Sequence, residues 1–503
     1  GSNTTGSDNT AMGVEALVTA TTAAGNTAFG RQAMCKTTTG ANNTAMGAFA
    51  LCANTTASDN VAVGRNAMLG TTTGASNLAA GTSAMQCNTT GANNTALGGN
   101  STMFANTTGS NNVAVGLSAL QSNTTAAENV AIGKQALQGN TTGASNTAVG
   151  TQSLYTNTTG ANNVAMGLGA LFANTTGSTN TAVGVSALTT NTTGGNNVAV
   201  GLCSLNANTT ASDNTAIGVV SLLATTTGSY NTAIGSGSMA TNTTGEFNTA
   251  TGVAALKRNT TGTVSTAVGY EALCANTTGD NNTAVGFKAL KVSTTGKFNV
   301  AMGNEALTAN TTACNNTAVG WRAGYVTTTG ADNVAIGKSA MQSHTTGTNN
   351  TSVGANSGFS TTTGSANTFA GHNSGNDVTT GSNNTFFGES SGTDAVRAVT
   401  TGSNNIVIGN NTSATAHIKI DWTVTSDLRD KTEIKNVTHG LDFVNQITPI
   451  EYKFKKSRED DTPHGPKKYG FKAQEILALE GDNPIIISNE DKENLKLTSA
   501  HLI

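Results

Sequence analysis

A glycine that closes the pattern Thr/Val-Ala-Val/Met/Ile-Gly recurs at a spacing of 17 residues from Gly13 to Gly98. One inserted residue moves the series to Gly116, and the spacing then holds to Gly388, which gives 23 coils. One irregular coil follows and ends at Gly409. A spacing this strict means that each repeat is one structural unit stacked on the next. The chain is therefore expected to fold as a repetitive stack rather than as several globular domains.

The composition agrees with a narrow fold dominated by the backbone. Charged residues make up 11% and aromatic residues 4% of the 503 residues, against roughly 25% charged residues in ordinary soluble domains. The net charge of −3 gives no general attraction to nucleic acid or to an anionic membrane face. The chain has no run of about 18 apolar residues, so membrane insertion is not expected either. It starts at Gly1 without a secretion signal, which suggests a processed chain or a fragment.

Each repeat contains two short apolar sections and one turn, as in residues 146–160. Residues 147–150, T-A-V-G, are β-branched and bounded by turn residues, which predicts a strand. Residues 153–154 occupy the A-L position and predict a second short straight section. Residues 157–160, N-T-T-G, predict a turn in which Gly supplies a positive φ and Asn bonds its own backbone. The expected fold is an all-β, flattened β-solenoid, and its 23 coils at about 4.8 Å make a rod on the order of 110 Å long.

The two faces of the expected strand are both free of charge. Thr/Val and Val/Met/Ile point one way, while Ala and Gly point the other way. A strand that is apolar on both faces should be buried on both, one face against its own coil and the other against something outside the chain. The simplest partner is the chain itself, in a homotrimer whose Ala and Gly faces approach closely about a common axis. The alternative is that the small face is exposed or covered by its own loop.

This pattern resembles the head repeats of trimeric autotransporter adhesins, whose coils carry a similar A-x-G motif in a left-handed β-roll. The repeats here are longer, because N-T-T-G forms an apparent inserted loop. After Gly320 larger residues enter, among them Trp321, Tyr325 and Phe369, in a form similar to repeats of bacterial and phage tail-fibre proteins. The packing of the rod is therefore expected to change toward its C-terminal end.

The recurrent N-T-T segment has three possible meanings. It is formally a glycosylation acceptor, so a chain passing through a eukaryotic secretory route could carry a ladder of glycans. Turn chemistry explains the same residues without sugar, because stacked Asn and Thr side chains hydrogen-bond between neighbouring coils. A third alternative is an ice-binding solenoid, in which Asn and the second Thr share a flat polar face that orders water.

The cysteines give no metal signal, because none of them lies in a C-x-x-C arrangement. The six are Cys35, Cys52, Cys87, Cys203, Cys274 and Cys314. Cys35 and Cys52 lie one repeat apart in the same register, so their backbones could be close enough for a disulfide, but scattered thiols in such a chain are more often plain small side chains. The rod also lacks paired carboxylates at positions suited to glycan hydrolysis. No cofactor and no metal are expected.

The composition changes near residue 420, because all four prolines and about half of the charged residues lie after it. Three blocks follow in order: S-D-L-R-D-K-T-E-I-K at 426–435, a segment through Pro449 and Tyr452, and G-F-K-A-Q-E at 470–475. Taken alone, Ser426 reads as a helix N-cap. Together, the blocks resemble the C-terminal intramolecular chaperone of phage tail spikes and fibres, including endosialidase tail spikes, over residues 426–503.

That resemblance implies a small α+β domain which helps three chains to register and then cuts itself off at its first residue. Ser426 would be the nucleophile and Lys431 its base, with cleavage between Thr425 and Ser426. The reaction happens once per chain and has no external substrate. The sequence stops at residues 495–503, where the family normally continues into a long helix, which suggests a shortened C-terminus.

The sequence therefore predicts three regions: a β-solenoid shaft at 1–409, a connecting strand at 410–425 and a chaperone domain at 426–503. The function expected from these parts is the shaft of a virion fibre that presents a surface to a host receptor or glycan. A bacterial cell-surface trimeric adhesin is the alternative, and both place the protein on a virion or cell surface.

Overall fold

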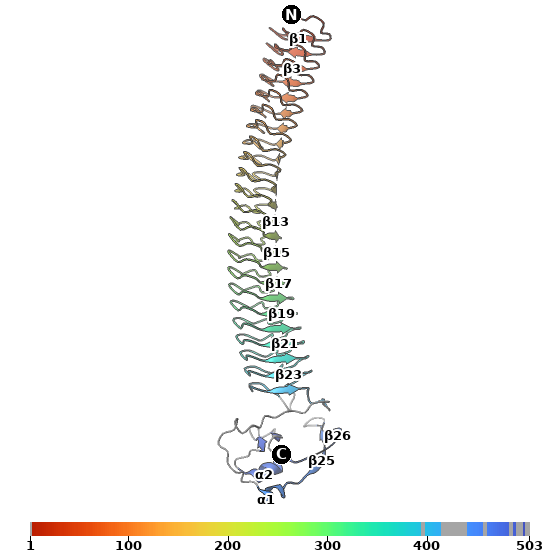
Figure 1. Ribbon diagram of the computed structural model, residues 1–503, viewed down its shortest axis with the longest axis vertical. Coiled ribbons are helices and arrows are strands. Elements are labelled where there is room, and N and C mark those ends of the chain that lie inside the picture. Colours follow the sequence, from red (N-terminus) through yellow and green to blue (C-terminus); the bar gives the residue numbers. More distant parts are fainter. Residues whose placement is uncertain are drawn as a thin grey trace. The chain divides into compact units, whose positions relative to one another are not determined.

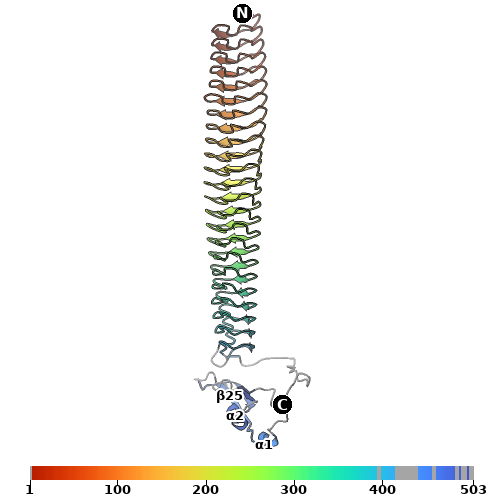
Figure 2. The same cartoon turned by 90° about the vertical axis from the view of Figure 1, so that its left-hand side faces the viewer.

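The computed structural model describes residues 3–393, 398–413, 440–455, 460–481, 486–488 and 496–497. The chain divides into two compact units, residues 1–350 and residues 351–503. The first unit is a stack of coils that follow one another along a single axis (Figures 1 and 2). The β-solenoid of 17-residue coils expected from the sequence is confirmed.

Each coil of the first unit contributes one strand of three residues to a parallel sheet. The strands are β1 (Thr10–Met12), β2 (Thr27–Phe29), β3 (Thr44–Met46), β4 (Val61–Val63), β5 (Leu78–Ala80), β6 (Thr95–Leu97), β7 (Val113–Val115), β8 (Val130–Ile132), β9 (Thr147–Val149), β10 (Val164–Met166), β11 (Thr181–Val183), β12 (Val198–Val200), β13 (Thr215–Ile217), β14 (Thr232–Ile234), β15 (Thr249–Thr251), β16 (Thr266–Val268), β17 (Thr283–Val285), β18 (Val300–Met302), β19 (Thr317–Val319) and β20 (Val334–Ile336). Neighbouring strands pair without offset, so that Ala165 of β10 lies between Ala148 of β9 and Ala182 of β11. The repeat spacing therefore sets the register directly.

The middle residue of each strand points into the coil. Ala148, Ala165 and Ala182 are fully buried, and they pack with a column of Leu and Met side chains such as Leu154. The prediction that the Ala and Gly face mediates contact between chains is therefore wrong, because the chain's own coil already covers the alanines. The face left uncovered carries the first and third residues of each strand.

The A-L section is not a second strand, contrary to the expectation of two straight sections per coil. Gln152 and Leu154 have φ values of 54° and 52°, in the left-handed region, so the backbone curls there. The amide of Leu154 donates to the carbonyl of Ala170 in the next coil at 2.9 Å, and the Leu154 side chain is fully buried. Burial of leucine and bonding between coils outweigh a backbone strain of about 1 to 2 kcal/mol.

The two recurrent glycines serve different purposes. Gly150, which ends the strand pattern, has a φ of 132°, and a Cβ there would lie 2.6 Å from the carbonyl oxygen of Gly167. Gly160, in N-T-T-G, does not have a positive φ, so the expectation for that turn is wrong. A Cβ there would approach the carbonyl oxygen of Gly177 to 2.4 Å, so the position takes only small residues. Some coils place alanine at this position, as at Ala126.

Two ladders of buried asparagine run along the first unit. In one, Asn157 of the N-T-T turn donates from Nδ2 to Oδ1 of Asn140 at 2.8 Å. In the other, the backbone amide of Asn163 donates to Oδ1 of Asn146 at 3.0 Å, just before the strand. The first Thr of the turn adds a third row, because Thr158 Oγ1 donates to the carbonyl of Thr175 at 3.0 Å. The predicted hydrogen bonding of Asn and Thr between coils is confirmed.

The second unit begins with four more strands of the same pattern. They are β21 (Thr351–Val353), β22 (Thr368–Ala370), β23 (Thr385–Phe387) and β24 (Ile406–Ile408). Phe369 replaces the inward alanine, and Gly375 stands at the position of the inward leucine. A Cβ on Gly375 would lie 2.3 Å from the Phe369 ring, so the larger ring fills the space that leucine vacates. The expected change of packing is confirmed within these coils.

The C-terminal part of the second unit contains short helices and strands. They are α1 (Leu441–Val444), β25 (Ile450–Lys455), β26 (Pro463–Gly470), α2 (Ala473–Glu480), β27 (Ile487–Ser488) and β28 (Lys496–Leu497). Strands β25 and β26 are antiparallel, as are β27 and β28. The expected small α+β module is therefore present.

Candidate functional site

The residues expected to carry the self-cleavage lie outside the described part of the chain. These are Thr425 and Ser426 at the cleavage site and Lys431 as the base. Their roles remain predictions.

The motifs that follow them are brought together by the β25–β26 hairpin. Pro449 precedes β25, and Ile450 pairs with Gly470, where the G-F-K-A-Q-E motif begins. A Cβ on Gly470 would lie 3.1 Å from Cε1 of Tyr452, so the tyrosine ring lies against the glycine backbone. Two blocks that are separate in sequence thus form one contact.

A buried carboxylate ties helix α2 to the chain that follows it. Glu480, at the end of α2, accepts hydrogen bonds from the amides of Ile486 at 2.6 Å and Ile487 at 2.9 Å. Both isoleucines pack with Phe443 of α1 and Ile476 of α2 in a small core. A carboxylate that receives two amide protons satisfies backbone groups which this small core would otherwise bury unpaired.

The module also exposes large apolar side chains. Tyr469 on β26 is 81% exposed and Leu441 on α1 is 73% exposed, and Val444 and Phe454 are more than half exposed. A small domain with this much apolar surface is suited to contact with other chains.

Comparison with protein families matches residues 426–482 to the family described as the chaperone of endosialidase. The C-terminal module therefore resembles the chaperone-of-endosialidase domain over these residues. The resemblance inferred from the three sequence blocks is confirmed. A search of curated proteins finds no match to the chain. The chaperone-of-endosialidase domain after a long β-solenoid fits a tail-fibre-like shaft.

A second candidate site is the outer face of the solenoid sheet in residues 1–350. The third strand residue is apolar in every strand from β1 to β20 except at Thr251, and no strand residue is charged. Met46, Ile132 and Met302 are 40–47% exposed. The next residue after the strand glycine is often apolar and exposed as well, as at Leu202. Because parallel sheets are normally covered on both faces, an uncovered apolar stripe of this kind is suited to docking.

The structure of the N-T-T turns fits neither the glycosylation alternative nor the ice-binding alternative. Asn157 is fully buried, and its Nδ2 also donates to the carbonyl of Gly160 at 2.8 Å, so it cannot take a glycan in the folded coil. The Asn and the second Thr do not share a face, because Thr159 is exposed while Asn157 is inside. The polar face assumed for ice binding is therefore absent from these turns.

The six cysteines of the shaft form no disulfide with one another in the structure. Cys35 Sγ donates to the carbonyl of Cys52 at 3.5 Å, which confirms their shared register, but both are free. Burial is the main cause that raises the pKa of the Cys35 thiol to about 12, and the neighbouring Cys52 raises it further. Thiols held protonated in this way are poor nucleophiles.

One buried residue of the asparagine ladder is a histidine. Comparison of the repeats in the sequence would have revealed it. His344 takes the place of Asn in H-T-T-G. Its Nδ1 lies 3.3 Å from Thr327 Oγ1 and its Nε2 lies 3.3 Å from Asn350 Nδ2. An amide nitrogen donates, so Nε2 accepts and Nδ1 carries the proton. Burial lowers the pKa of His344 to about 4.

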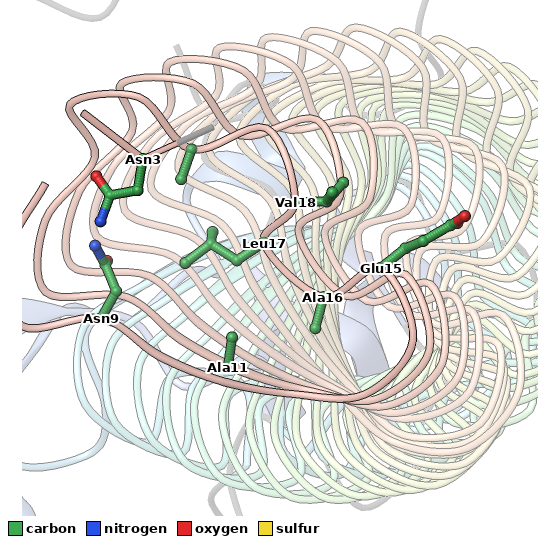
Figure 3. Close-up of a pocket in the computed structure, with 8 residues that line it drawn as sticks. Asn3, Asn9, Ala11, Glu15, Ala16, Leu17 and Val18 are labelled. Atoms are coloured by element: carbon green, nitrogen blue, oxygen red, sulfur yellow. The ribbon is translucent and has the colours of Figure 1, made fainter. Parts of the chain in front are cut away.

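A hollow of about 360 Å³ opens at the first coil (Figure 3). Ala11, Ala16 and Leu17 line it, and Glu15 lies at its outer side. It is the apolar interior of the first coil, on the side that the preceding coil covers in the later coils of this unit. Among the described residues, no helix is long and apolar enough to span a membrane.

Proposed function

We propose that the chain is the shaft of a homotrimeric fibre on a virion surface, used in host attachment, with a C-terminal domain that aligns three chains and then releases itself. The observation that carries this proposal is the uncharged, uncovered outer face of β1–β20. Three copies that turn this face toward a common axis cover it completely. The chaperone-of-endosialidase domain supports three copies, since its family implies self-trimerisation.

The same face explains why a shaft of this kind needs an aligning domain. Ile217 of β13 and Ile234 of β14 occupy equivalent places in neighbouring coils. A shift of one chain by one coil would exchange one for the other at little cost in free energy. A domain that brings the three C-terminal ends together removes this ambiguity.

Self-cleavage requires only the residues next to the bond. Neutral Lys431 takes the proton from Ser426 Oγ, and the oxygen attacks the carbonyl carbon of Thr425. The bond to the Ser426 nitrogen breaks and the nitrogen is protonated, which leaves an ester to Ser426 Oγ. Water then hydrolyses the ester, giving a carboxylate at Thr425 and a free hydroxyl at Ser426. Loss of the aligning domain makes unfolding of the trimer hard to reverse.

The test compares the wild-type chain with Ser426→Ala and Lys431→Ala on a denaturing gel. We expect the wild type to lose a fragment that begins at Ser426 and both variants to stay whole. Equal migration of all three would overturn the cleavage proposal. Sedimentation equilibrium of the uncleaved Ser426→Ala chain should give three times the subunit mass of 50.3 kDa, and a single subunit mass would overturn the trimer.

A further inference from the structure

Equivalent residues of successive coils form columns along the first unit, and one solvent-facing column that is otherwise polar or glycine becomes apolar in a few coils. The column consists of the residue two positions before each strand, such as Asn162 before β10. Elsewhere in residues 1–350 it holds only Asp, Asn, Ser, Thr, Glu or Gly. Four positions within five consecutive coils instead hold Tyr230, Phe247, Val264 and Phe298, which we call the apolar ridge.

The ridge residues are unfavourable for folding. Their φ values are 60°, 56°, 54° and 58°, in the left-handed region that Asn, Asp and Gly tolerate and that a β-branched residue such as Val264 disfavours. They gain little burial in return, because each side chain is 53–57% exposed. Asn281 lies between Val264 and Phe298 and shows that a polar residue fits the same coils. Folding alone therefore does not account for the ridge.

The neighbouring column changes in the same coils. The residue just before each ridge position is Ser, Ala or Gly in every coil of the first unit from residue 7 to residue 229. In the next four coils it becomes Glu246, Thr263, Asp280 and Lys297, which precede Phe247, Val264, Asn281 and Phe298 and which we call the polar row. Two columns that depart together from a strict repeat indicate a shared purpose.

The polar row is ordered by bonds between coils. Asp280 Oδ1 accepts hydrogen bonds from the amide and the Oγ1 of Thr263 at 2.9 and 3.2 Å. Lys297 Nζ lies 2.7 Å from Asp280 Oδ2, and this ion pair lowers the pKa of Asp280 although burial opposes it. The hydroxyl, carboxylate and ammonium groups are thus held at the spacing of the coils, about 4.8 Å.

The ridge is also ordered. The rings of Tyr230 and Phe247 are parallel within 3°, with centroids 5.0 Å apart. From Tyr230 to Phe298 the chain makes four coil steps, so the ridge is about 19 Å long and one side chain wide. A stable protein interface needs about 800 Å² on each partner, which is more than one such column offers. A narrow, elongated ligand fits this surface better than a folded protein does.

We propose that the apolar ridge and the polar row together bind a neutral oligosaccharide chain. The apolar faces of sugar rings would contact the ridge, while sugar hydroxyls would hydrogen-bond to the polar row. The row carries two carboxylates, and its one ammonium group is already paired with Asp280, so its charge disfavours an anionic glycan. This inference rests on the proposed role in host attachment and names the class of receptor for that role.

The test uses an array of neutral gluco-, galacto-, manno- and N-acetylglucosamine oligosaccharides together with sulfated and sialylated glycans. The 503-residue protein should be retained by at least one neutral oligosaccharide. The double variant Phe247→Asn with Phe298→Asn restores the usual residue of the column, and we expect it to fold at least as well and to lose binding at least tenfold. Glu246→Gln should weaken binding without changing the unfolding temperature.

The matched control is Tyr155→Asn, which removes one ring of another stacked aromatic pair, Tyr155 and Phe172, from a column that belongs neither to the ridge nor to the outer sheet face and that holds asparagine at Asn206. It should bind as the wild type does. No retention on neutral glycans, retention only on anionic glycans, or equal binding by the double variant would overturn the proposal. Sedimentation equilibrium of the same samples separates this failure from a failure of the trimer, because a trimer that binds no neutral glycan contradicts only the ridge.

Discussion

Asn157 donates from its Nδ2 to Oδ1 of Asn140, one coil earlier, at 2.8 Å, and both side chains are fully buried. The Oδ1 of Asn157 in turn accepts from Nδ2 of Asn174 at 2.8 Å. From Asn106 to Asn191 each amide of this row is therefore both donor and acceptor. In a core made mostly of alanine, such rows fix the stacking of one coil on the next.

Replacing Asn157 by alanine should weaken the shaft locally. The change leaves Asn140 Oδ1 without its donor and one Nδ2 proton of Asn174 without its acceptor, whereas the Gly160 carbonyl keeps Asn146 Nδ2 as a donor. Unpaired buried groups cost about 1 to 3 kcal/mol each, so we expect a loss of about 3 kcal/mol after partial relaxation. Hydrogen exchange of the flanking coils and the urea midpoint measure the effect. Thr159→Ala, on the exposed side of the same turn, is the control, and an equal loss there would contradict the ladder's role.

Two glycines, Gly150 and Gly169, distinguish the steric effect of an added Cβ from the effect of a left-handed backbone. Gly150→Ala should destabilise the shaft by more than about 2 kcal/mol, because its Cβ would lie 2.6 Å from the Gly167 carbonyl oxygen. Gly169 also has a positive φ, of 61°, but a Cβ there meets nothing within 4 Å. Gly169→Asn should therefore leave the urea midpoint unchanged or raise it. If both substitutions had the same effect, the steric explanation for Gly150 would fail.

The period and the strand could be predicted from the sequence, because a strict repeat with β-branched residues has few other solutions. The left-handed turn through Gln152 and Leu154 could not be predicted, since leucine rarely adopts a positive φ. That conformation follows from hydrogen bonds to the next coil, which only the stacked structure reveals. The same limit explains the wrong face: alternation separates Ala from Val, but not inside from outside when both are apolar.

For the candidate site, sequence blocks identified the chaperone-of-endosialidase match, and two of their residues, Tyr452 and Gly470, lie against each other in the structure. The apolar ridge was missed. Its signal lies in the comparison of one column across coils, where Phe247 replaces a residue that is polar elsewhere. Only the exposure and φ of that column show that the replacement is unfavourable for folding.

The shaft should lose stability in acid around His344. Its pKa is about 4 in the folded coil against 6.5 as the ordinary value, so the unfolded chain binds more protons between these values. Stability is complete above pH 6.5 and falls as the pH drops toward 4, by about 3 kcal/mol in total, because each pH unit contributes about 1.4 kcal/mol. A proton on Nε2 would also face the Asn350 amide donor.

Hydrogen exchange of residues 327–350 between pH 7 and pH 4 measures this effect. His344→Asn restores the residue found in most other coils and should remove the acid-dependent step while keeping neutral stability. A step that persists in His344→Asn would assign it to other groups.

The outer sheet face gives the last prediction. Ile217 and Ile234 are each 39% exposed and lie in register on β13 and β14. In a trimer they would be buried, so Ile217→Lys with Ile234→Lys places two unpaired charges in an apolar interface. We expect this variant to sediment as single chains, or to dissociate at a concentration at least a hundredfold higher than the wild type. Thr210→Lys with Thr227→Lys puts the same charge on exposed turn positions of the same region and should leave the trimer intact. If the isoleucine variant also stayed trimeric with unchanged affinity, the chains would have to meet through another face, because an apolar contact cannot accept two bare ammonium groups without loss.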